Sequence, residues 1–330
     1  MKIGVIGSGS WGTALVKILT QNLFDVTWCV RSERMANHIR TRSHNPKYLS
    51  SVYFNNNQLN IVTDSAAVYQ NTEAIVIAVP SGYVEDYVLP YLEIIADGKV
   101  LISATKGMLP NSNLLLNQFL KQDAGFDEKQ YVAIMGPCHA EEVAAERLSY
   151  LTFAGVDVAL ATKVASFFST PYINTVVSAD VDGVQYAAVL KNIYAIGTGI
   201  AHGLGYGDNF QSVLVANAAG EMKKFLRTTV TGSEKVNYAA SVYLGDLLVT
   251  CYSLYSRNRS FGNMIGKGYS VEAAKLAMQM VAEGFPASKS IHDLGLGFSL
   301  DTPIATGIYK ILWDKQDPAE VFASLEKIFI

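Results

Sequence analysis

The chain has 330 residues, of which 50% are apolar and 17% are charged, and its formal net charge is −3. This composition excludes a disordered chain, because such chains lack the apolar surface needed to offset the entropy of ordering. A mean hydropathy of +0.19 raises the question of a membrane protein, but a spanning helix needs about 20 consecutive apolar residues. Asp246 interrupts the most apolar central stretch, 239–255. We therefore expect a soluble protein without membrane insertion.

Charge and cysteine content narrow the possible function classes. A slightly acidic chain is a poor candidate for nucleic-acid binding, because phosphates attract strongly basic surfaces. The three cysteines, Cys29, Cys138 and Cys251, form no CxxC pair, and we interpret them as free thiols of a cytoplasmic protein. The five histidines show no spacing typical of a metal site, so we expect no metal.

In the first part of the chain, short apolar runs alternate with amphipathic segments. The runs are continuously apolar, which is typical of parallel strands buried on both faces. We expect strands at 2–6, 26–30, 74–79, 100–103 and 132–135. We expect helices between them at 11–21, 34–40, 83–95 and 113–121. Two further β-like runs, 148–154 and 173–177, flank a helical stretch at 158–168 and should extend the same sheet. The sequence thus predicts an α/β domain with a Rossmann-type, mostly parallel sheet.

From about residue 180 the strand-like runs stop and helical signals follow. Asp180 can cap a helix that extends to residue 202, and Asp208 with Gln211 has the pattern of a capping box. Thr302 and Asp317 each precede a proline, a combination that favours the first turn of a helix. We therefore place an α/β domain at 1–179 and an all-α domain at 180–330.

A glycine-rich turn, Gly7-Ser8-Gly9-Ser10-Trp11-Gly12, joins the first strand to the first helix. In such turns the first glycine permits the tight bend, the second lets the backbone approach a pyrophosphate, and the third lets the helix pack on the strand. The helix N-terminus then offers free N–H groups and a positive dipole end to the anion. Because the motif lies within a β-α-β pattern, it predicts dinucleotide binding in the domain at 1–179. The alternative is a glycine-rich turn without a ligand.

The end of the second strand indicates which dinucleotide is bound. NAD sites usually place Asp or Glu there, whereas NADP sites use Arg for the 2′-phosphate. Arg31 occupies this position and Arg34 lies on the next turn, so we favour NADP(H) and keep NAD(H) as the alternative. In that alternative, Ser32 caps the following helix and both arginines are solvated.

Further motifs recur in an order typical of one enzyme family. They are Gly7 to Ala14, Ser103-Ala104-Thr105-Lys106-Gly107, Gly136-Pro137, Leu190-Lys191-Asn192-Ile193, Gly245-Asp246-Leu247, Ser256 to Gly262, and Glu283-Gly284. From residue 2 to about residue 312, the chain resembles the NAD(P)-dependent glycerol-3-phosphate dehydrogenases of the bacterial type, which have a two-domain plan like that of 6-phosphogluconate dehydrogenase. The resemblance implies reversible reduction of dihydroxyacetone phosphate to sn-glycerol 3-phosphate, which supplies glycerophospholipid synthesis. The domain at 180–330 would then bind the substrate and carry the catalysis.

Lys191 is the expected proton donor and acceptor. Ketone reduction needs a proton donor near the carbonyl oxygen, and burial or a neighbouring cation lowers the pKa of a lysine toward the working pH. Lys191 lies among apolar residues on the helix that opens the second domain. From the residues alone, Lys191 could equally be a catalytic residue or a lysine that extends along a helix surface. The resemblance assigns it the catalytic role.

Two further residues are expected to act with Lys191. Lys106 follows the fourth predicted strand, where ligands bind in open α/β sheets, and could contact substrate and cofactor and polarise the carbonyl. Otherwise it is a loop lysine in solvent. Asp246 interrupts an apolar stretch, and a buried carboxylate needs a partner, for which we propose Lys191 or a substrate hydroxyl. The alternative for Asp246 is a helix N-cap.

Arg257, with Ser256 and Asn258, forms the expected phosphate site in a turn-like segment. A guanidinium keeps its charge at any working pH and matches phosphate geometry. The resemblance places Arg257 between the substrate phosphate and the cofactor. It assigns cofactor contacts to Ser10, Trp11, Arg31, Ala140, Val281 and Glu283, and substrate contacts to Gly136 and Cys138. Cys138 replaces the usual Ser or Thr of the family, and a thiol is a weak donor.

Two other functions fit the same scaffold. A β-hydroxyacid or ketopantoate-type dehydrogenase needs a carboxylate site, which the run 256–258 and Lys106 disfavour. A non-catalytic dinucleotide-sensing protein could lack the proton donor, but Lys191 and Asp246 are both present. We also expect a homodimer that acts on a small molecule.

Overall fold

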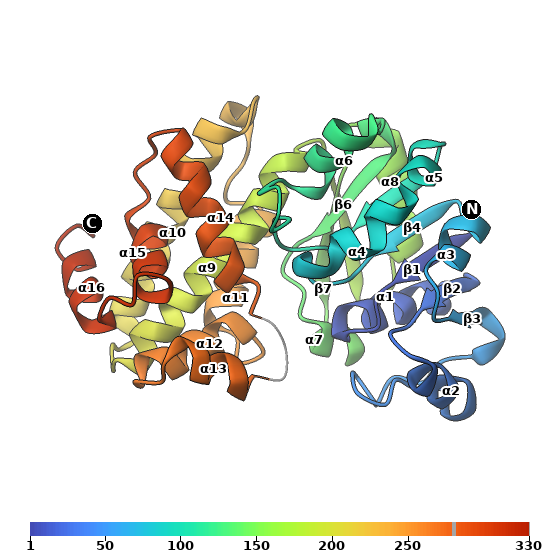
Figure 1. Cartoon of the computed structure of the whole chain (residues 1–330), viewed down its shortest axis with the longest axis horizontal. Coiled ribbons are helices and arrows are strands. Elements are labelled where there is room, and N and C mark those ends of the chain that lie inside the picture. The colour runs from blue at the N-terminus through green and yellow to red at the C-terminus, as the bar shows by residue number, and fades with distance from the viewer. Residues whose placement is uncertain (279–281, 330) are drawn as a thin grey trace. The chain divides into compact units, whose positions relative to one another are not determined.

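The structure is a computed structural model that describes residues 1–278 and 282–329. It divides into two compact units, one formed by Met1–Thr105 with Leu114–Val181 and the other by Lys106–Asn113 with Asp182–Ile330. Figure 1 labels helices and strands of both units. No helix within the described residues is both long and apolar enough to cross a lipid bilayer.

The first unit is built on an eight-stranded sheet with the order β3-β2-β1-β4-β5-β6-β7-β8. The strands are β1 (Ile3–Ile6), β2 (Val26–Cys29), β3 (Leu59–Val62), β4 (Ala74–Ile77), β5 (Val100–Ser103), β6 (Tyr131–Met135), β7 (Ser149–Ala154) and β8 (Ile173–Ser178). All neighbours are parallel except β6 and β7. The predicted fold class is therefore confirmed: a mostly parallel, Rossmann-type sheet is followed by helices.

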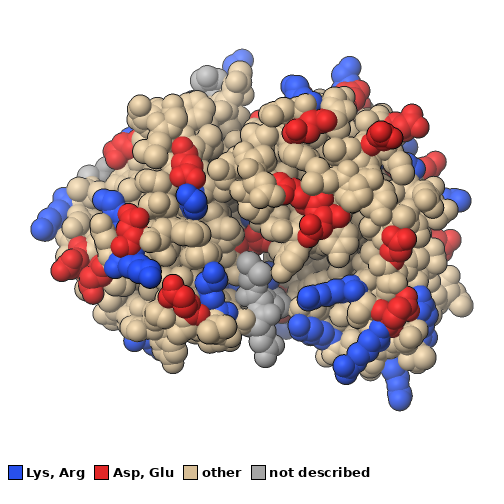
Figure 2. Space-filling view, viewed as in Figure 1, with Lys and Arg blue, Asp and Glu red and all other residues tan. Residues whose placement is uncertain are grey.

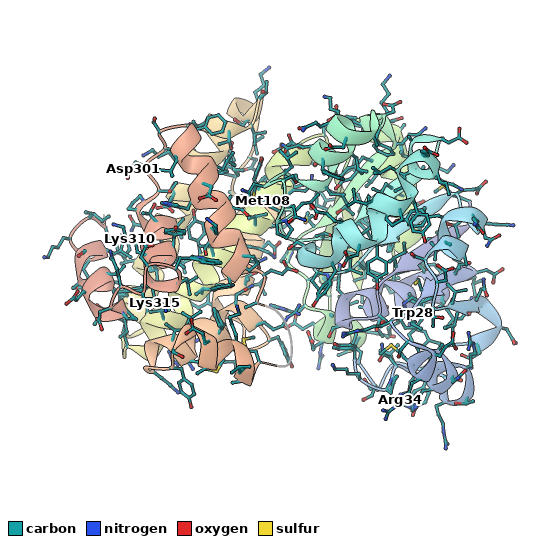
Figure 3. All side chains as sticks on the ribbon, in the orientation of Figure 1. Trp28, Arg34, Met108, Asp301, Lys310 and Lys315 are labelled. Atoms are coloured by element: carbon teal, nitrogen blue, oxygen red, sulfur yellow. The ribbon has the colours of Figure 1, made fainter. Side chains whose placement is uncertain are left out.

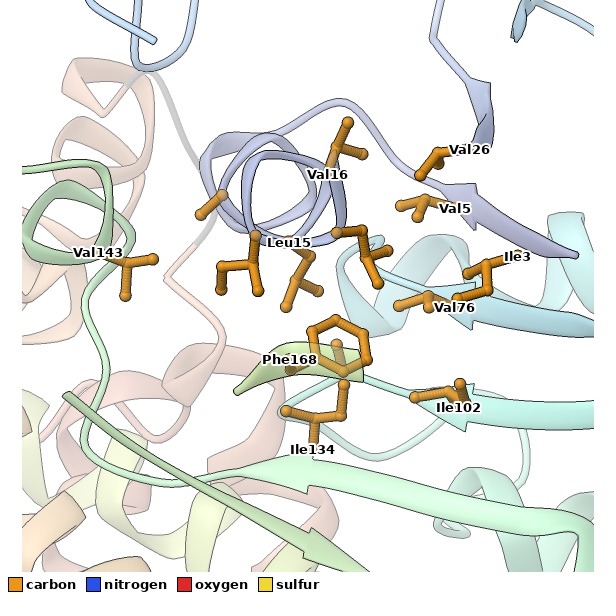
Figure 4. Packing of buried hydrophobic residues seen from close by; sticks show 14 of the residues in the cluster. Ile3, Val5, Leu15, Val16, Val26, Val76, Ile102, Ile134, Val143 and Phe168 are labelled. Carbon is orange, nitrogen blue, oxygen red and sulfur yellow. The ribbon is translucent and has the colours of Figure 1, made fainter. Parts of the chain in front are cut away.

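Helices cover the sheet of the first unit (Figure 1). They are α1 (Ser10–Gln21), α2 (Glu33–Arg42), α3 (Ala66–Asn71), α4 (Val84–Val88), α5 (Leu92–Ala96), α6 (Leu116–Ala124), α7 (Ala140–Ala144) and α8 (Val158–Phe168). Figure 4 shows how Leu15 of α1 and Phe168 of α8 pack over strand residues that include Val76, Ile102 and Ile134. This apolar layer anchors α1, whose N-terminus follows the glycine-rich turn.

Helices form the second unit. They are α9 (Val181–Gly203), α10 (Asp208–Thr229), α11 (Asp246–Tyr252), α12 (Arg257–Gly266), α13 (Val271–Ala277), α14 (Gly284–Gly297), α15 (Pro303–Leu312) and α16 (Pro318–Leu325). Along most of its length α9 is buried, and α12, α14 and α15 approach it closely (Figure 1). Its few buried polar side chains therefore need hydrogen-bond partners.

Several local expectations need correction. The helix expected at 83–95 is broken, because Pro90 lies in a short 3-10 turn between α4 and α5. The helix expected from 113 begins at Leu116, and Asn113 has a left-handed φ of 56°. Asp208 is the first residue of α10 and does not cap it; Gly207 holds the cap position. Asp317 does cap α16 through two backbone N–H groups.

Candidate functional site

The glycine-rich turn lies where the strand order reverses between β1 and β4, the position at which open α/β sheets bind ligands. Gly7 has a φ of +125°, and a Cβ there would collide with the carbonyl oxygen of Ala78. A Cβ on Gly12 would collide with the carbonyl oxygen of Gly7. In contrast, a Cβ on Gly9 would meet no atom within 4 Å. The first and third glycines are therefore required by packing, whereas the second leaves open space beside the start of α1 that a pyrophosphate could fill.

Residues at the end of β2 hold this turn in place. The indole Nε1 of Trp28 donates to the carbonyl of Gly7 at 2.9 Å, and the Gly7 N–H donates to the carbonyl of Cys29 at 3.2 Å. Trp28 is fully buried in the first unit (Figure 3). The backbone N–H of Arg31 donates to the Ser8 hydroxyl at 3.2 Å. The backbone of Arg31 is thus attached to the turn, which leaves its side chain available for a ligand.

Arg31 and Arg34 both have exposed side chains. Ser32 caps α2 by accepting from the backbone N–H of Met35 at 3.4 Å, as the alternative interpretation proposed. Arg34, labelled in Figure 3, lies on α2, and Figure 2 shows Lys and Arg side chains gathered at this end of the first unit. The exposed cations of this stretch are Arg31, Arg34, Arg40, Arg42 and Lys47. Such a surface suits an added phosphate group.

Gly136 and Cys138, which follow β6 in the chain, lie close to Tyr150 near the start of β7. Gly136 has a φ of +126°, and a Cβ there would lie 2.7 Å from the carbonyl oxygen of Tyr150. The thiol of Cys138 donates to the same carbonyl at 3.1 Å. Ala140 is the buried first residue of α7. The Cys138 proton is therefore directed at the main chain, and its contact with substrate stays a prediction.

In the second unit, Lys191 of α9 and Asp246 of α11 form a buried ion pair through Nζ and Oδ1. Their side chains are only 4% and 2% exposed. The expectation that Asp246 pairs with Lys191 is thus confirmed. Thr250 lies one turn further along α11, and its hydroxyl donates to the Asp246 carbonyl at 2.6 Å. Among the described residues, Oδ2 of Asp246 has no hydrogen-bond partner, so the carboxylate keeps an acceptor for a ligand.

A chain of amide hydrogen bonds runs beside this ion pair. The backbone N–H of Gly284 donates to Oδ1 of Asn258 at 2.9 Å, and Nδ2 of Asn258 donates to Oδ1 of Asn192 at 2.9 Å. Nδ2 of Asn192 in turn donates to the carbonyl of Lys106 at 3.1 Å. Lys191 and Asn192 are neighbours on α9. The helix therefore carries Lys191 itself and holds the backbone of Lys106 through Asn192.

The run Ser256 to Asn258 begins a helix and is not the turn that the sequence suggested. Ser256 caps α12 by accepting from the backbone N–H of Arg259 at 3.3 Å, and Arg257 is the first helical residue, with an exposed side chain. A helix N-terminus with an adjacent arginine favours an anion. The expected phosphate site therefore gains backbone N–H groups that the sequence did not reveal.

Asn192 and Thr250 were missed as site residues. The sequence signal for Asn192 is its place in the family motif Leu190 to Ile193, directly after Lys191. For Thr250, the signal was its i,i+4 spacing from Asp246. Glu283 lies at the N-cap position of α14, and the expected cofactor contact of Val281 lies outside the described residues.

Within residues 1–278 and 282–329, no three His, Cys, Asp or Glu side chains gather in a group that could hold a metal ion.

Known proteins that are similar to this chain belong to the family that these motifs indicate. Residues 2–161 match a family model described as the NAD-dependent glycerol-3-phosphate dehydrogenase N-terminus, and residues 180–323 match the model of its C-terminus. The chain is 31% identical to a glycerol-3-phosphate dehydrogenase (NAD(P)+) of Macrococcus caseolyticus, with 97% of this chain and 96% of that protein covered. For the protein of that name from Lacticaseibacillus paracasei, the identity is 33% and the coverage 99% and 94%. The crystal structure of a glycerol-3-phosphate dehydrogenase from Coxiella burnetii has a TM-score of 0.91 and 26% identity, with 98% of each chain covered.

Proposed function

Because the chain belongs to the NAD-dependent glycerol-3-phosphate dehydrogenase family, we propose that it catalyses the reversible, NAD(P)H-dependent reduction of dihydroxyacetone phosphate to sn-glycerol 3-phosphate. The observation that carries this proposal is the buried Lys191–Asp246 pair, beside which an amide chain holds Lys106. The product would supply glycerophospholipid synthesis. The main alternative, a ketopantoate-type or other β-hydroxyacid dehydrogenase, lacks a comparable supporting observation.

The first unit would bind the dinucleotide. The open space at Gly9, the start of α1 and the exposed Arg31 and Arg34 support pyrophosphate and 2′-phosphate contacts. We propose Ser10, Trp11, Gly12 and Ala140 as further cofactor-binding residues, with Lys106, Arg257 and Glu283 from the second unit. Either NADP(H) or NAD(H) can occupy such a turn, and Arg31 favours NADP(H).

The reduction adds a hydride to the carbonyl carbon and a proton to its oxygen. The reduced nicotinamide supplies the hydride when bound. Lys191 would donate the proton to the developing alkoxide, and would take it back in the oxidation direction. Asp246 keeps the ammonium in place, and its unpartnered Oδ2 would accept from a substrate hydroxyl. Lys106 would polarise the carbonyl oxygen as charge develops there.

The substrate phosphate would bind at the N-terminus of α12. Arg257 offers a guanidinium, and Ser256 offers a hydroxyl that is already oriented by capping. Asn258 holds this end of α12 against α9 through Asn192. Gly136 and Cys138 are proposed as substrate contacts of the first unit. A phosphate site of this kind distinguishes the proposal from a carboxylate-binding dehydrogenase.

A spectrophotometric assay tests the proposal. The full chain is mixed with dihydroxyacetone phosphate and, separately, NADH and NADPH, and oxidation of the reduced cofactor is followed by absorbance. We expect turnover that depends on the phosphorylated ketone. Ketopantoate and dihydroxyacetone without phosphate are the matched controls. Comparable turnover with either control would overturn the proposed substrate, and binding without any turnover would favour a dinucleotide-sensing protein.

We further propose that residues 1–179 act as the dinucleotide-binding domain and residues 180–330 as the substrate-binding and catalytic domain, in a cytoplasmic homodimer. Three free cysteines support a reducing compartment. Light scattering of the purified chain would test the dimer, which a monomeric mass at working concentration would contradict.

A further inference from the structure

Asn45 lies on the loop after α2 and is fully buried, with 0% of its surface exposed. Its Oδ1 accepts from the backbone N–H groups of Lys47 and Tyr48 at 3.0 and 3.1 Å. Its Nδ2 donates in the other direction, to the carbonyl of Ser8 at 3.1 Å and to the hydroxyl of Thr13 at 2.9 Å. The Asn45 side chain thus connects the loop in which it lies to the glycine-rich turn and to α1.

The hydrogen bonds of Asn45 reach the peptide groups on both sides of Gly9. The Ser8 carbonyl precedes Gly9 and is held directly. The Gly9 carbonyl is held through Thr13, whose hydroxyl donates to it at 2.8 Å and whose backbone N–H donates at 2.9 Å. Thr13 is itself 0% exposed.

The orientation of these carbonyls decides where the next N–H groups point. Each peptide is trans, and a trans peptide places its C=O and its N–H on opposite sides of the chain. Holding the carbonyls of Ser8 and Gly9 therefore orients the N–H groups of Gly9 and Ser10. These belong to the start of α1, where N–H groups have no partner within the helix and are free to bind an anion.

We propose that Asn45 is a positioning residue for the dinucleotide: it fixes the two peptide groups beside Gly9 so that their N–H groups are preorganised for the pyrophosphate. This inference rests on the proposed dinucleotide binding. It assigns no catalytic step to Asn45, because every bond of its side chain goes to the protein. Its effect should appear in cofactor affinity and not in the chemical step.

Asparagine is the residue that this position requires. The oxygen must accept from two N–H groups while the nitrogen donates to a carbonyl and a hydroxyl. An ionised aspartate has the same shape but only accepts. Asn45→Asp would therefore keep the turn at Lys47 and Tyr48 and lose both bonds toward the glycine-rich turn. The two roles of Asn45 can thus be separated by one substitution.

The test measures dissociation constants of NADPH and NADH for the full chain by titration calorimetry. For Asn45→Ala we expect both constants to rise roughly 10- to 100-fold, because two donors to the turn are lost. The KM of dihydroxyacetone phosphate and kcat at saturating cofactor should stay within about twofold of wild type. A rise in dinucleotide KM without loss of kcat separates positioning from general damage to the fold.

Asn22→Ala is the matched control. Asn22 lies at the other end of α1, and its Nδ2 also donates to two backbone carbonyls, those of Phe167 and Ser169, at 2.8 and 2.9 Å. We expect its thermal stability to fall while its dinucleotide affinity stays unchanged. Equal losses of affinity in both variants would assign the effect to α1 in general and overturn the inference.

Two further variants keep the test decisive if Asn45→Ala does not fold. Thr13→Val removes one hydroxyl without changing shape or charge, and should raise both dissociation constants by less than Asn45→Asp does. Wild-type affinity in both variants would overturn the inference while leaving dinucleotide binding intact. Failure of the wild-type chain to bind NADPH or NADH would instead overturn the proposed function.

Discussion

At the residue scale, the Lys191–Asp246 pair is the feature that stability alone does not explain. Removing two charges from water is expensive, and a buried ion pair often stabilises a protein no better than apolar residues of the same volume. The pair nevertheless lies within apolar helices, at 4% and 2% side-chain exposure. A proton-transfer role gives the pair a function beyond holding α9 and α11 together.

Lys191→Ala should lower kcat for dihydroxyacetone phosphate reduction by about 10²- to 10⁴-fold, the usual range for loss of a general acid. Dinucleotide affinity should stay unchanged, because Lys191 is not among the proposed cofactor-binding residues. Steady-state kinetics and cofactor titration of the same preparation measure both. Near-normal turnover would remove Lys191 from the mechanism.

The control for Lys191→Ala must account for stability, since the variant leaves Asp246 buried without its cation. Loss of one partner of a buried pair costs about 3–5 kcal/mol of unfolding free energy, whereas replacing both by apolar residues is close to neutral. A Lys191→Met and Asp246→Leu double variant should therefore unfold near the wild-type denaturant midpoint and still lack turnover. Activity in this well-folded variant would contradict the proposed proton transfer.

Arg31→Glu should shift the cofactor preference from NADPH toward NADH by about tenfold or more, because a carboxylate repels a 2′-phosphate and can bind a ribose hydroxyl. The backbone bond from Arg31 to Ser8 is retained in this variant. The ratio of kcat/KM for the two cofactors is the readout. Arg42→Glu changes the same charge at the other end of α2 and should leave the ratio unchanged. A ratio that moves equally in both variants would indicate a general charge effect.

Glu221 is a buried carboxylate outside the proposed site. Burial raises its pKa to about 7, although the N–H groups of Ile304 and Ala305 and the hydroxyl of Tyr194 lower it by donating to the carboxylate. The folded state thus keeps a proton that the unfolded chain releases near its ordinary pKa of 4.5. The stabilising contribution of this proton is complete below pH 4.5 and is lost as the pH rises to about 7.

We therefore expect the unfolding free energy of the wild type, relative to Glu221→Gln, to fall by on the order of 2–3 kcal/mol between pH 5 and pH 8. Denaturant titrations of both proteins at several pH values give this difference, in which all other titrating groups cancel. A difference that does not change with pH would show that Glu221 is ionised across the whole range.

At the element scale, the buried strands were predictable and the half-exposed elements were not. The strands β1, β4 and β5 are almost fully buried, so each appears in the sequence as a continuous apolar run. The edge strand β3 has one buried residue, Ile61, and follows an Asn-rich segment, so it has no such run. The antiparallel pairing of β6 and β7 depends on contacts distant in sequence and leaves no local pattern.

The contact between α9 and α12 could likewise not be predicted from local sequence patterns. A Cβ on Gly199 or Gly203 of α9 would collide with the backbone carbonyls of Arg259 and Asn263, respectively. On the other helix, a Cβ on Gly262 would collide with the carbonyl of Ile196. The two helices therefore pack backbone against backbone. This close approach sets the distance across which Asn258 reaches Asn192.

Gly262→Ala should lower the unfolding free energy by roughly 1–3 kcal/mol, because overpacking at a backbone contact forces the helices apart. It should also lower kcat, since Asn192 and Lys106 lose their alignment. Gly220→Ala is the matched control: Gly220 lies within α10, and a Cβ there would meet no atom within 4 Å. That variant should gain about 0.5–1 kcal/mol from helix propensity. Denaturant unfolding and steady-state kinetics of both variants measure these effects. Equal changes in unfolding free energy and kcat in the two variants would contradict the proposed packing role of Gly262.

At the scale of the whole molecule, the change from strand-like to helical patterns near residue 180 made a two-part organisation predictable. The exception is the short segment Lys106–Asn113, which follows β5 in sequence but belongs to the second unit. Its membership depends on contacts such as that from Asn192 to the Lys106 carbonyl, across 86 residues. The sequence predicted the glycine-rich turn and the pairing of Lys191 with Asp246, and it indicated Lys106 and Lys191 as the lysines for the proposed catalysis. The amides of Asn45 and Asn192 were not predicted, because a buried asparagine has no distinctive spacing.

The two units should respond to different ligands in hydrogen exchange of the full chain. NADPH should protect backbone amides most strongly at 7–13 and 45–48, and sn-glycerol 3-phosphate at 106–113 and 256–260. A ligand at about 100 times its dissociation constant stabilises the bound state by roughly 2.7 kcal/mol, which slows local opening about 100-fold. The helix α16 serves as an internal reference, because no expected contact lies on it. Protection of 7–13 by the phosphorylated product alone, with none from NADPH, would contradict the assignment of the dinucleotide to the first unit.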